Sequence, residues 1–218
     1  MTMNSEEVAR FYKALKDTKL SAVEALVKEH VSARVPPVAI LEKGLVGAMA
    51  IVGQEFRAGQ IWVPEVLLAA RNLSRGIEVL RPELVKGDLK PKGKIVIGTV
   101  KGDIHDIGKN LVAIMMTGAG YEVIDLGTDV SQEKFLEAIT REHPDLVGLS
   151  ALLTTTMLEM KGIIQRIRDT FSAPPKILIG GAPVNQKFSE EIRADGYGED
   201  AVRAVEVADR VLSSRGQT

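Results

Sequence analysis

The sequence VKGDIHDIGKN occupies residues 100–110 and joins two apolar segments of the chain. The segment before it, 94–100, has the composition of a buried strand, and the segment 107–118 is predicted to form a helix. The loop between them carries Asp103 and His105. Because ligands bind outside the carboxyl ends of the strands in open α/β sheets, these two side chains mark a candidate binding site.

The spacing of Asp103 and His105 suits an oriented metal ligand. A carboxylate that accepts one ring N–H of a histidine fixes the tautomer and makes the other nitrogen a better donor to a metal. A bare zinc ion needs three or four protein ligands, and the chain has no cysteine and only two further histidines, His30 and His143. One histidine instead suits a metal that a macrocycle already holds. The alternative is an ordinary surface loop.

Strands and helices are predicted to alternate from residue 94 onward. The predicted strands are 94–100, 121–126, 145–149, 176–180 and 195–198, and the predicted helices are 107–118, 131–142, 156–170, 185–194 and 199–213. The strands 145–149 and 176–180 are apolar on both faces, as central parallel strands are. The pattern predicts a doubly wound, parallel, five-stranded sheet of the flavodoxin-like or Rossmann-like kind, with strand order 2-1-3-4-5.

The chain before residue 88 is predicted to be helical only. Apolar residues recur every three or four positions along 38–56 and along 66–80, which gives each helix one face to bury. Short connections between four amphipathic helices favour an antiparallel bundle. The predicted organisation is α plus α/β: a helical-bundle cap domain at 1–88, a linker at 89–93 and an α/β domain at 94–218.

Composition argues against several classes of function. The 218 residues carry a net charge of −1 with no basic run, so neither nucleic acid nor an anionic membrane is an expected partner. The N-terminus is polar and acidic, unlike a signal peptide, and no apolar run approaches the ~20 residues that span a bilayer. Paired catalytic carboxylates, a nucleophile elbow and a phosphate loop are all missing from the sequence. We expect a cytoplasmic protein with no catalytic residue of its own.

Several pieces of the sequence resemble cobalamin-binding proteins of methyltransferase systems. Residues 102–110, GDIHDIGKN, are similar to the Asp-x-His-x-x-Gly signature of that family, and SALLTTT at 150–156 and GGAP at 180–183 follow in the family's order and spacing. Residues 56–65, FRAGQIWVPE, are similar to the segment of methionine synthase and its relatives in which a helical domain covers the upper face of the corrin. The resemblance extends over nearly the whole chain.

The resemblance implies that cobalamin binds base-off and His-on. His105 would replace the cofactor's own base as the lower axial ligand of cobalt, and Asp103 would accept the other ring N–H. Thr156 would extend this chain of hydrogen bonds where methionine synthase has a serine. The further cofactor-binding residues that are implied or expected are Gly108, where the backbone can approach a ligand closely, Ser150, Leu152, Thr154, Gly180, Gly181 and Tyr197 around the nucleotide tail, and Phe56 and Val63 over the methyl group.

These assignments have plainer structural alternatives. A glycine pair after a strand is a common turn, the threonines at 154–156 could cap the following helix, Phe56 could be bundle core and Trp62 a hydrophobic staple. Asp106 and Lys109 are predicted to be solvated, although Lys109 and Asn110 could meet side-chain amides of the corrin. His30 is expected at the surface or partly buried and His143 in a turn, neither of them as a ligand.

The resemblance also implies a function. The protein would be a corrinoid methyl carrier that holds cobalamin as methylcobalamin or as a Co(I) corrinoid. Its implied partners are a substrate-specific methyltransferase, an acceptor methyltransferase that uses a folate or thiol, and a reductive activator. Methoxylated aromatics, methylamines, methanol and betaines are the donor classes of such systems, with a slight preference here for an O-demethylase or methylamine type.

Two other functions remain open at the level of sequence. A cobalamin-dependent sensor would pair similar domains with a DNA-binding domain, yet no recognition helix or basic arm is evident. The small subunit of an adenosylcobalamin mutase would carry a similar histidine loop. The predicted four-helix cap and the DIGKN sequence at 106–110 argue against that branch.

Overall fold

A computed structural model describes residues 4–85 and 91–213 of the chain. The chain divides into two compact units, one comprising 1–91 with 118–120 and the other comprising 92–117 with 121–218. The predicted linker lies partly outside the described residues. The domain limits given above therefore stay a prediction, and the two units are described separately.

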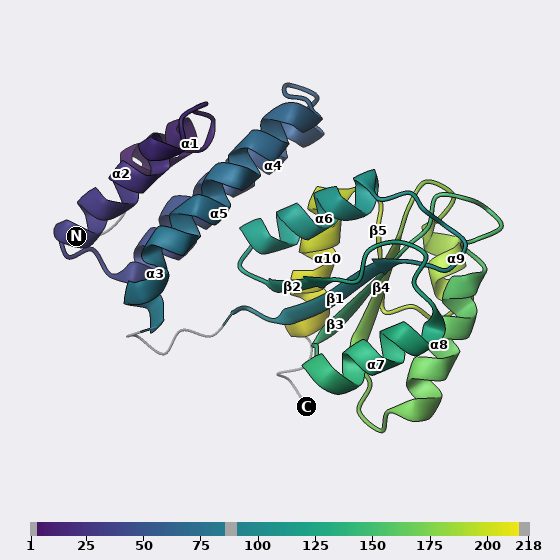
Figure 1. Ribbon diagram of the computed structural model, residues 1–218. Helices are drawn as coiled ribbons and strands as arrows, with labels where there is room; N and C mark the ends of the chain where they lie inside the picture. Colours follow the sequence, from purple (N-terminus) through teal and green to yellow (C-terminus); the bar gives the residue numbers. More distant parts are fainter. Residues whose placement is uncertain (1–3, 86–90, 214–218) are drawn as a thin grey trace. The chain divides into compact units, whose positions relative to one another are not determined.

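The first unit, called the helical unit here, contains the helices that were expected before residue 88 (Figure 1). They are α1 (Ser5–Leu15), α2 (Leu20–Ser32), α3 (Pro37–Ala39), η1 (Ile40–Val46), α4 (Gly47–Arg57) and α5 (Val63–Val85). The short α3, the π-helical η1 and α4 follow one another without a break. The predicted apolar faces are buried, as shown by Leu45, Met49 and Val52 on one helix and by Val66 and Leu73 on the other.

The helical run 37–57 corrects one expectation. It is 21 residues long with a mean hydropathy of 1.3, so its length and composition would allow it to cross a membrane. In the helical unit 39% of its most apolar window is buried, and Ile40, Leu45 and Ala48 are fully buried there. A core helix of a folded bundle can meet the same criteria as a membrane span, and this run buries one apolar face within the helical unit.

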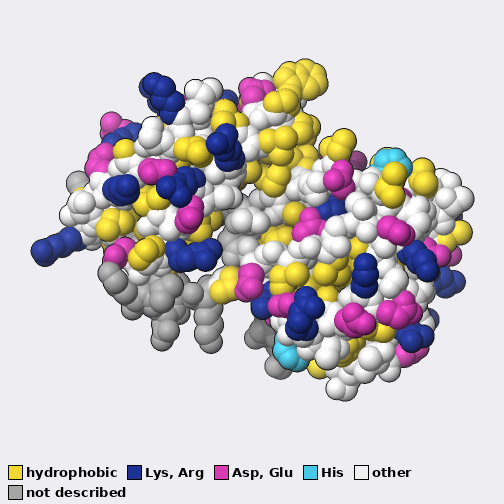
Figure 2. Space-filling model, in the orientation of Figure 1, with side chains coloured by type: hydrophobic (Ala, Val, Ile, Leu, Met, Phe, Trp, Pro, Cys, Tyr) yellow, Lys and Arg dark blue, Asp and Glu magenta, His cyan; other side chains and the backbone are white. Residues whose placement is uncertain are grey.

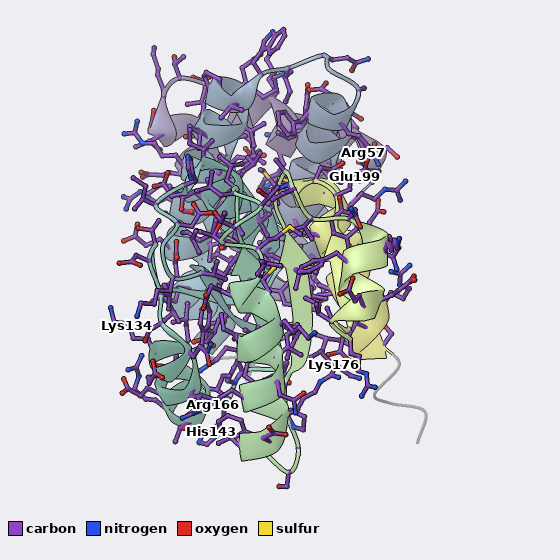
Figure 3. All side chains as sticks on the ribbon, turned by 90° about the vertical axis from the view of Figure 1, so that its right-hand side faces the viewer. Arg57, Lys134, His143, Arg166, Lys176 and Glu199 are labelled. Carbon is purple, nitrogen blue, oxygen red and sulfur yellow. The ribbon has the colours of Figure 1, made fainter. Side chains whose placement is uncertain are left out.

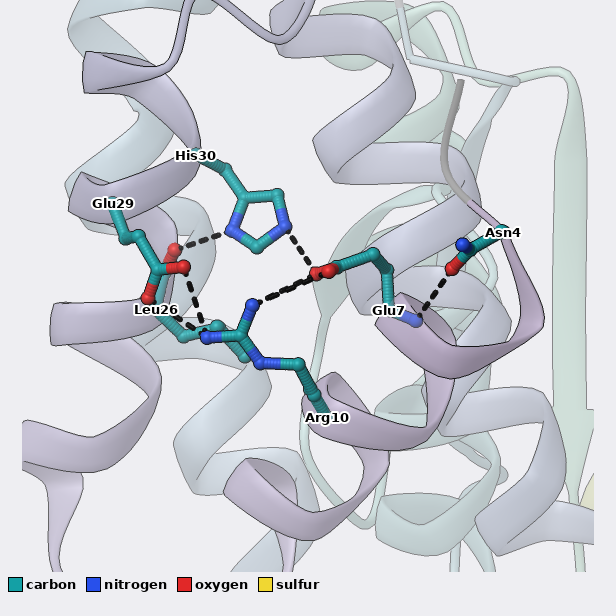
Figure 4. Close-up of polar contacts among 6 residues, drawn as sticks. All are labelled: Asn4, Glu7, Arg10, Leu26, Glu29 and His30. Carbon is teal, nitrogen blue, oxygen red and sulfur yellow. Dashed lines mark hydrogen bonds and ion pairs between the residues drawn. The ribbon is translucent and has the colours of Figure 1, made fainter. Parts of the chain in front are cut away.

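A polar network ties α1 to α2 (Figure 4). His30 is 5% exposed, with Nδ1 2.8 Å from the Leu26 carbonyl oxygen and Nε2 2.7 Å from Glu7 Oε2. Arg10 donates to Glu7 Oε2 at 3.1 Å and to Glu29 Oε2 at 2.8 Å. The expectation that His30 lies at the surface or is partly buried was wrong, because these partners on both helices compensate for its burial.

The second unit, called the α/β unit here, contains the predicted sheet. Its strands are β1 (Lys94–Thr99), β2 (Glu122–Asp125), β3 (Leu146–Ser150), β4 (Lys176–Gly180) and β5 (Gly196–Gly198), and its helices are α6 (Ile107–Gly118), α7 (Gln132–Glu142), α8 (Glu159–Thr170), α9 (Gln186–Glu191) and α10 (Ala201–Ser213). All strand pairs are parallel, in the order β2-β1-β3-β4-β5. The predicted fold class and strand order are confirmed.

Helices cover both faces of this sheet. Figure 1 shows α6 and α10 on one face and α7, α8 and α9 on the other. Val96, Val147 and Ile177 of the central strands are fully buried in one cluster with Phe135 of α7 and Met160 of α8. Central strands buried on both faces are what the continuous apolar runs predicted.

Charged residues and His143 lie where the sequence suggested. Figure 2 shows positive and negative side chains interspersed over the face that it displays, in keeping with the small net charge. His143 ends α7 with a φ of 47° and is exposed, so it is a turn residue. It lies in the loop before β3, at the amino edge of the sheet, near the end of the unit where Figure 3 labels it. The candidate site is at the opposite, carboxyl edge.

Candidate functional site

Three loops meet at the carboxyl edge of the sheet. They are the β1–α6 loop (100–106), the β2–α7 loop (126–131) and the β3–α8 loop (151–158). Strands β2 and β3 both pair with β1, so the first loop lies between the other two. Residues far apart in the sequence are brought together there by strand order alone.

Asp103 is the centre of the hydrogen bonds in this region. Its side chain is fully buried, which is costly for a carboxylate unless donors surround it. It accepts hydrogen bonds from His105 Nδ1 at 2.7 Å, His105 N at 3.0 Å, Leu152 N at 2.8 Å, Leu153 N at 3.4 Å and Thr156 Oγ1 at 2.6 Å. Burial alone raises the pKa of Asp103, but the bonds from Thr156, Leu152 and His105 outweigh it and hold that pKa far below its usual range.

His105 is oriented by this carboxylate. An ionised carboxylate only accepts, so Nδ1 of His105 carries the proton of the 2.7 Å bond. Within 4–85 and 91–213 no residue forms a hydrogen bond with Nε2, and the side chain is 47% exposed. Thr99 Oγ1 also donates to the His105 carbonyl oxygen at 2.9 Å. The loop therefore presents Nε2 of His105 outward in a fixed orientation.

Thr156 joins this hydrogen-bonded unit. The predicted chain Thr156–Asp103–His105 is present, although the first two residues come from different loops. The predicted helix 156–170 begins only at Glu159, because residues 152–158 turn toward Asp103 instead of continuing α8. No side chain caps α8, so the threonines at 154–156 do not serve as its cap.

Exposed apolar side chains gather in the loops that carry Asp103, His105 and Thr156. Among the described residues of the α/β unit, every large hydrophobic side chain that is exposed belongs to the two loops that meet at Asp103 or to the adjoining turn of α6: Ile104 (78%), Ile107 (74%), Leu152 (43%), Leu153 (42%) and Leu158 (61%). Such a concentration of exposed apolar surface is typical of an interaction site. Of these residues only Leu152 was predicted to belong to the site; isoleucines on both sides of the histidine in a polar loop were the available signal.

The residues predicted around a nucleotide tail lie at the same edge. Ser150 pairs with Thr99 on one side and with Gly180 on the other, and Gly180 pairs with Gly198 of β5. Leu152 and Thr154 are exposed, whereas Tyr197 is half-buried. These residues therefore continue the site from β3 toward β5.

Gly181 has a structural explanation of its own. Its φ is +122°, and a Cβ atom there would come within 1.8 Å of the Ala151 carbonyl oxygen. Only glycine fits such a position, with or without a ligand. Gly108 is different, because a Cβ atom at that position would meet nothing within 4 Å. The fold itself therefore gives no reason for a glycine at residue 108.

Lys109 corrects a prediction. Its side chain is 1% exposed instead of solvated; its ammonium forms an ion pair with Asp125 and donates to Asn110 Oδ1 at 2.7 Å. Asn110 Nδ2 in turn donates to Asp106 Oδ2 at 3.1 Å, and Asp106 is exposed as expected. The ammonium is thus enclosed within the unit and is not presented at its surface.

The candidate residues of the helical unit lie around the end of α4 and the start of α5. Phe56 and Val63 are both half-buried, so Phe56 is not simply bundle core. Trp62 is 75% exposed, which rules out its role as a hydrophobic staple. Its backbone N–H instead donates to Glu65 Oε2 at 2.8 Å, a bond that satisfies a free donor at the start of α5.

The donor set fits a metal that brings its own equatorial ligands. Among the described residues there is no group of three or more histidine, cysteine, aspartate or glutamate side chains that could hold a metal ion. His105 offers one nitrogen, and a single protein nitrogen is sufficient only where a macrocycle supplies the other ligands. The apolar side chains beside it suit the rim of such a macrocycle.

Comparisons with known proteins agree with this chemistry. A family model described as a B12 binding domain matches residues 93–206. A second model with the same description matches residues 7–81. Together the two matches account for most of the chain, including both units.

Relatives match along almost the full length. A corrinoid protein of Desulfitobacterium hafniense is 43% identical over 180 residues, 79% of this chain and 82% of that protein. Trimethylamine corrinoid protein 1 of Methanosarcina acetivorans is 37% identical over 97% of this chain and 100% of its own length. Among solved structures, the methanol:cobalamin methyltransferase complex MtaBC of Methanosarcina barkeri gives a TM-score of 0.84 at 30% identity, covering 97% of this chain and 81% of the matched chain.

Proposed function

The chain belongs to the family of B12-binding corrinoid proteins of methyltransferase systems, and from that premise we propose that it carries a methyl group between two methyltransferases. The resemblance to this family is confirmed, and so is a corrinoid as the cofactor. The same comparisons favour this function over a sensor or a mutase subunit. The observation that supports the proposal best is the 2.7 Å bond from His105 Nδ1 to Asp103, which leaves Nε2 available on a loop with exposed apolar side chains.

His105 is the proposed lower axial ligand. Bound cobalamin would supply a cobalt centre able to accept and release a methyl group. The chain itself would hold that centre through one imidazole nitrogen of His105. Asp103 fixes the tautomer and the ring orientation, and the donors from Leu152 and Thr156 keep the carboxylate charged and in place.

The remaining cofactor contacts are proposed from the resemblance and the geometry together. Ser150, Leu152, Thr154, Gly180, Gly181 and Tyr197 would surround the nucleotide tail, and Gly108 would allow close contact with the corrin. Phe56 and Val63 would shield the methyl group. We propose that the helical unit is the cap domain and the α/β unit the cobalamin domain, with the limits predicted above.

Membership of the family implies a methyltransferase partner. We propose in addition which methyl donor and which acceptor the partners use. Among the solved structures, identity to the monomethylamine corrinoid protein of Methanosarcina barkeri is 37%, against 30% to the protein in the methanol complex, which supports a methylated amine as the methyl donor. The second partner would be an acceptor methyltransferase that uses a folate or a thiol, and a reductive activator would restore an oxidised cofactor. These protein partners supply the substrate sites that the chain itself lacks in its sequence.

Reconstitution with hydroxocobalamin tests the ligand assignment. His105→Ala is expected to lose the absorbance change of His-on binding and to retain less cobalamin on gel filtration. His143→Ala serves as the matched control, since His143 is exposed at the opposite edge of the sheet. Unchanged spectra and retention in His105→Ala would overturn the assignment. Supplying the reduced, loaded protein to purified methyltransferases with methylated amines or methanol then identifies the donor.

A further inference from the structure

We infer that Asp125 and Asp129 are positioning residues for His105, an inference that rests on the proposed role of His105 as axial ligand. The two carboxylates stand at the ends of one short segment, 125–129, which runs from the last residue of β2 into the β2–α7 loop. One holds the backbone before His105 and the other holds the residues after it. We call this segment the brace.

The Asp129 end of the brace holds the turn that contains Asp103. Asp129 Oδ1 accepts a hydrogen bond from Gly102 N at 2.7 Å. Asp129 N donates in return to the Asp103 carbonyl oxygen at 2.9 Å. This reciprocal pair fixes the 101–102 and 103–104 peptide groups, which lie on either side of the Gly102–Asp103 peptide. The φ of Asp129 is 53°, a left-handed value that aspartate and asparagine tolerate better than most residues.

The Asp125 end holds the residues after His105. Asp125 pairs with the buried ammonium of Lys109, and Lys109 Nζ donates to Asn110 Oδ1 at 2.7 Å. Asn110 then reaches back to Asp106, with Nδ2 donating to Oδ2 at 3.1 Å and N donating to the Asp106 carbonyl oxygen at 2.7 Å. Asp106 directly follows His105 in the sequence. The contacts from Asp125 through Lys109 and Asn110 therefore reach the residue next to His105.

The brace is itself anchored on β1. Leu126 N donates to the Ile97 carbonyl oxygen at 2.8 Å, Thr99 N donates to the Gly127 carbonyl oxygen at 3.0 Å, and Val130 N donates to the Thr99 carbonyl oxygen at 2.9 Å. These bonds continue the pairing of β1 with β2 beyond the last strand residue. The brace therefore connects the residues before and after His105 to the sheet. These contacts are independent of those that Leu152, Leu153 and Thr156 make with Asp103.

A ligand loop held in this way is organised before the cofactor arrives. The two carboxylates lie outside the Asp103–His105–Thr156 unit, and neither forms a hydrogen bond with the imidazole ring. Their effect on cobalt would pass through the backbone. Loss of such outer contacts typically weakens metal ligation about 10- to 100-fold.

The Asp129 side chain gives the sharpest test. Asp129→Ala removes the acceptor for Gly102 N–H, and Asp129→Gly removes it while restoring freedom of φ, in case the alanine variant does not fold. Asp129→Asn keeps an oxygen acceptor and a residue that tolerates the left-handed conformation. In the cofactor-free chain, amide hydrogen exchange at Gly102 and Asp103 is expected to accelerate in the alanine and glycine variants and to stay near wild type in the asparagine variant.

The same variants are then loaded with cob(II)alamin. The nitrogen superhyperfine splitting in the electron paramagnetic resonance spectrum reports the fraction with His105 on cobalt. We expect ligation to weaken about tenfold in Asp129→Ala and Asp129→Gly and to be rescued by Asp129→Asn. The double variant Lys109→Met/Asp125→Asn removes both charges of the other end together and is expected to weaken ligation as well.

Asp195→Ala is the matched control. Asp195 Oδ2 also accepts a backbone hydrogen bond, from Ile177 N at 2.9 Å, but at the amino edge of the sheet. It is expected to lower stability without altering exchange at Gly102 or the splitting. Wild-type ligation in Asp129→Gly, or an asparagine variant as impaired as the glycine variant, would overturn the inference. Absence of splitting in the wild type would instead contradict the proposed function. The exchange rates of Gly102 and Asp103 would still show whether Asp129 holds the loop in the cofactor-free chain.

Discussion

Thr156 Oγ1 lies 2.6 Å from Asp103 Oδ2, although the two residues are 53 positions apart and belong to loops on neighbouring strands. The bond supplies the only donor to Asp103 that comes from a side chain other than His105 in the described part of the chain. It links the orientation of the His105 ring to the segment just before α8.

Thr156→Val should therefore weaken both the α/β unit and His105 ligation. A buried acceptor deprived of its donor costs about 1–3 kcal/mol, whereas Thr156→Ser keeps the hydroxyl and should cost less. Urea unfolding measures the first effect, and the absorbance of the loaded protein the second. Thr140→Val is a suitable control, because the Thr140 hydroxyl donates to the Leu136 carbonyl oxygen on the exposed side of α7.

Gly108→Ala should separate folding from cofactor binding. Nothing lies within 4 Å of the added Cβ atom and α6 begins at Ile107, so alanine should stabilise the unit by up to about 1 kcal/mol. If a corrin approaches Gly108 closely, cobalamin uptake should fall in the same variant. Thermal unfolding and gel filtration with cobalamin measure the two effects. Undiminished uptake would remove Gly108 from the proposed site.

Phe56→Ala should expose the methyl group of a chain loaded with methylcobalamin. We expect demethylation by a small thiol to accelerate about tenfold, which corresponds to ~1.4 kcal/mol of barrier. Absorbance at fixed thiol concentration follows the reaction. Phe171→Ala removes another half-buried phenylalanine, just after α8 at the amino edge of the sheet, and should leave the rate unchanged. If Phe56→Ala and Phe171→Ala lose the methyl group at equal rates, Phe56 has only a structural role.

Glu7 should make the stability of the helical unit depend on acid pH. Burial raises the pKa of Glu7, but the hydrogen bond from His30 and the charge of Arg10 outweigh it and lower that pKa overall. A carboxyl whose pKa is lower in the folded state stabilises that state above the pKa of the unfolded chain. This contribution is lost as the pH falls through the folded-state value.

Glu7→Gln should therefore cost about 0.2–1 kcal/mol at neutral pH and progressively less in acid. Amide exchange along α1 in urea, at neutral and acid pH, measures the difference from wild type. Glu6→Gln alters the exposed neighbouring residue and is the control. A pH-independent difference between Glu7→Gln and wild type would refute the linkage.

The fold was predictable because its signals are local. Alternating apolar runs and helices from residue 94 indicated the strand order, and the spacing of Asp103 and His105 indicated an oriented ligand. Contacts between loops gave no local signal. The burial of Lys109 in α6 depends on Asp125, 16 positions away at the end of β2, and a lysine near a loop is normally solvated. The late start of α8 likewise depends on Asp103, which the sequence of α8 does not contain.

The distribution of contacts around Asp103 has a practical consequence for protein engineering. Residues 100–110 obtain their geometry from the brace at 125–129 and from the backbone at 152–153, neither of which is contiguous with them. If the histidine motif alone is grafted onto another flavodoxin-like scaffold, its imidazole should therefore lack a fixed orientation and should not bind a corrinoid. The smallest portable module is all three loops, transplanted together on three adjacent strands.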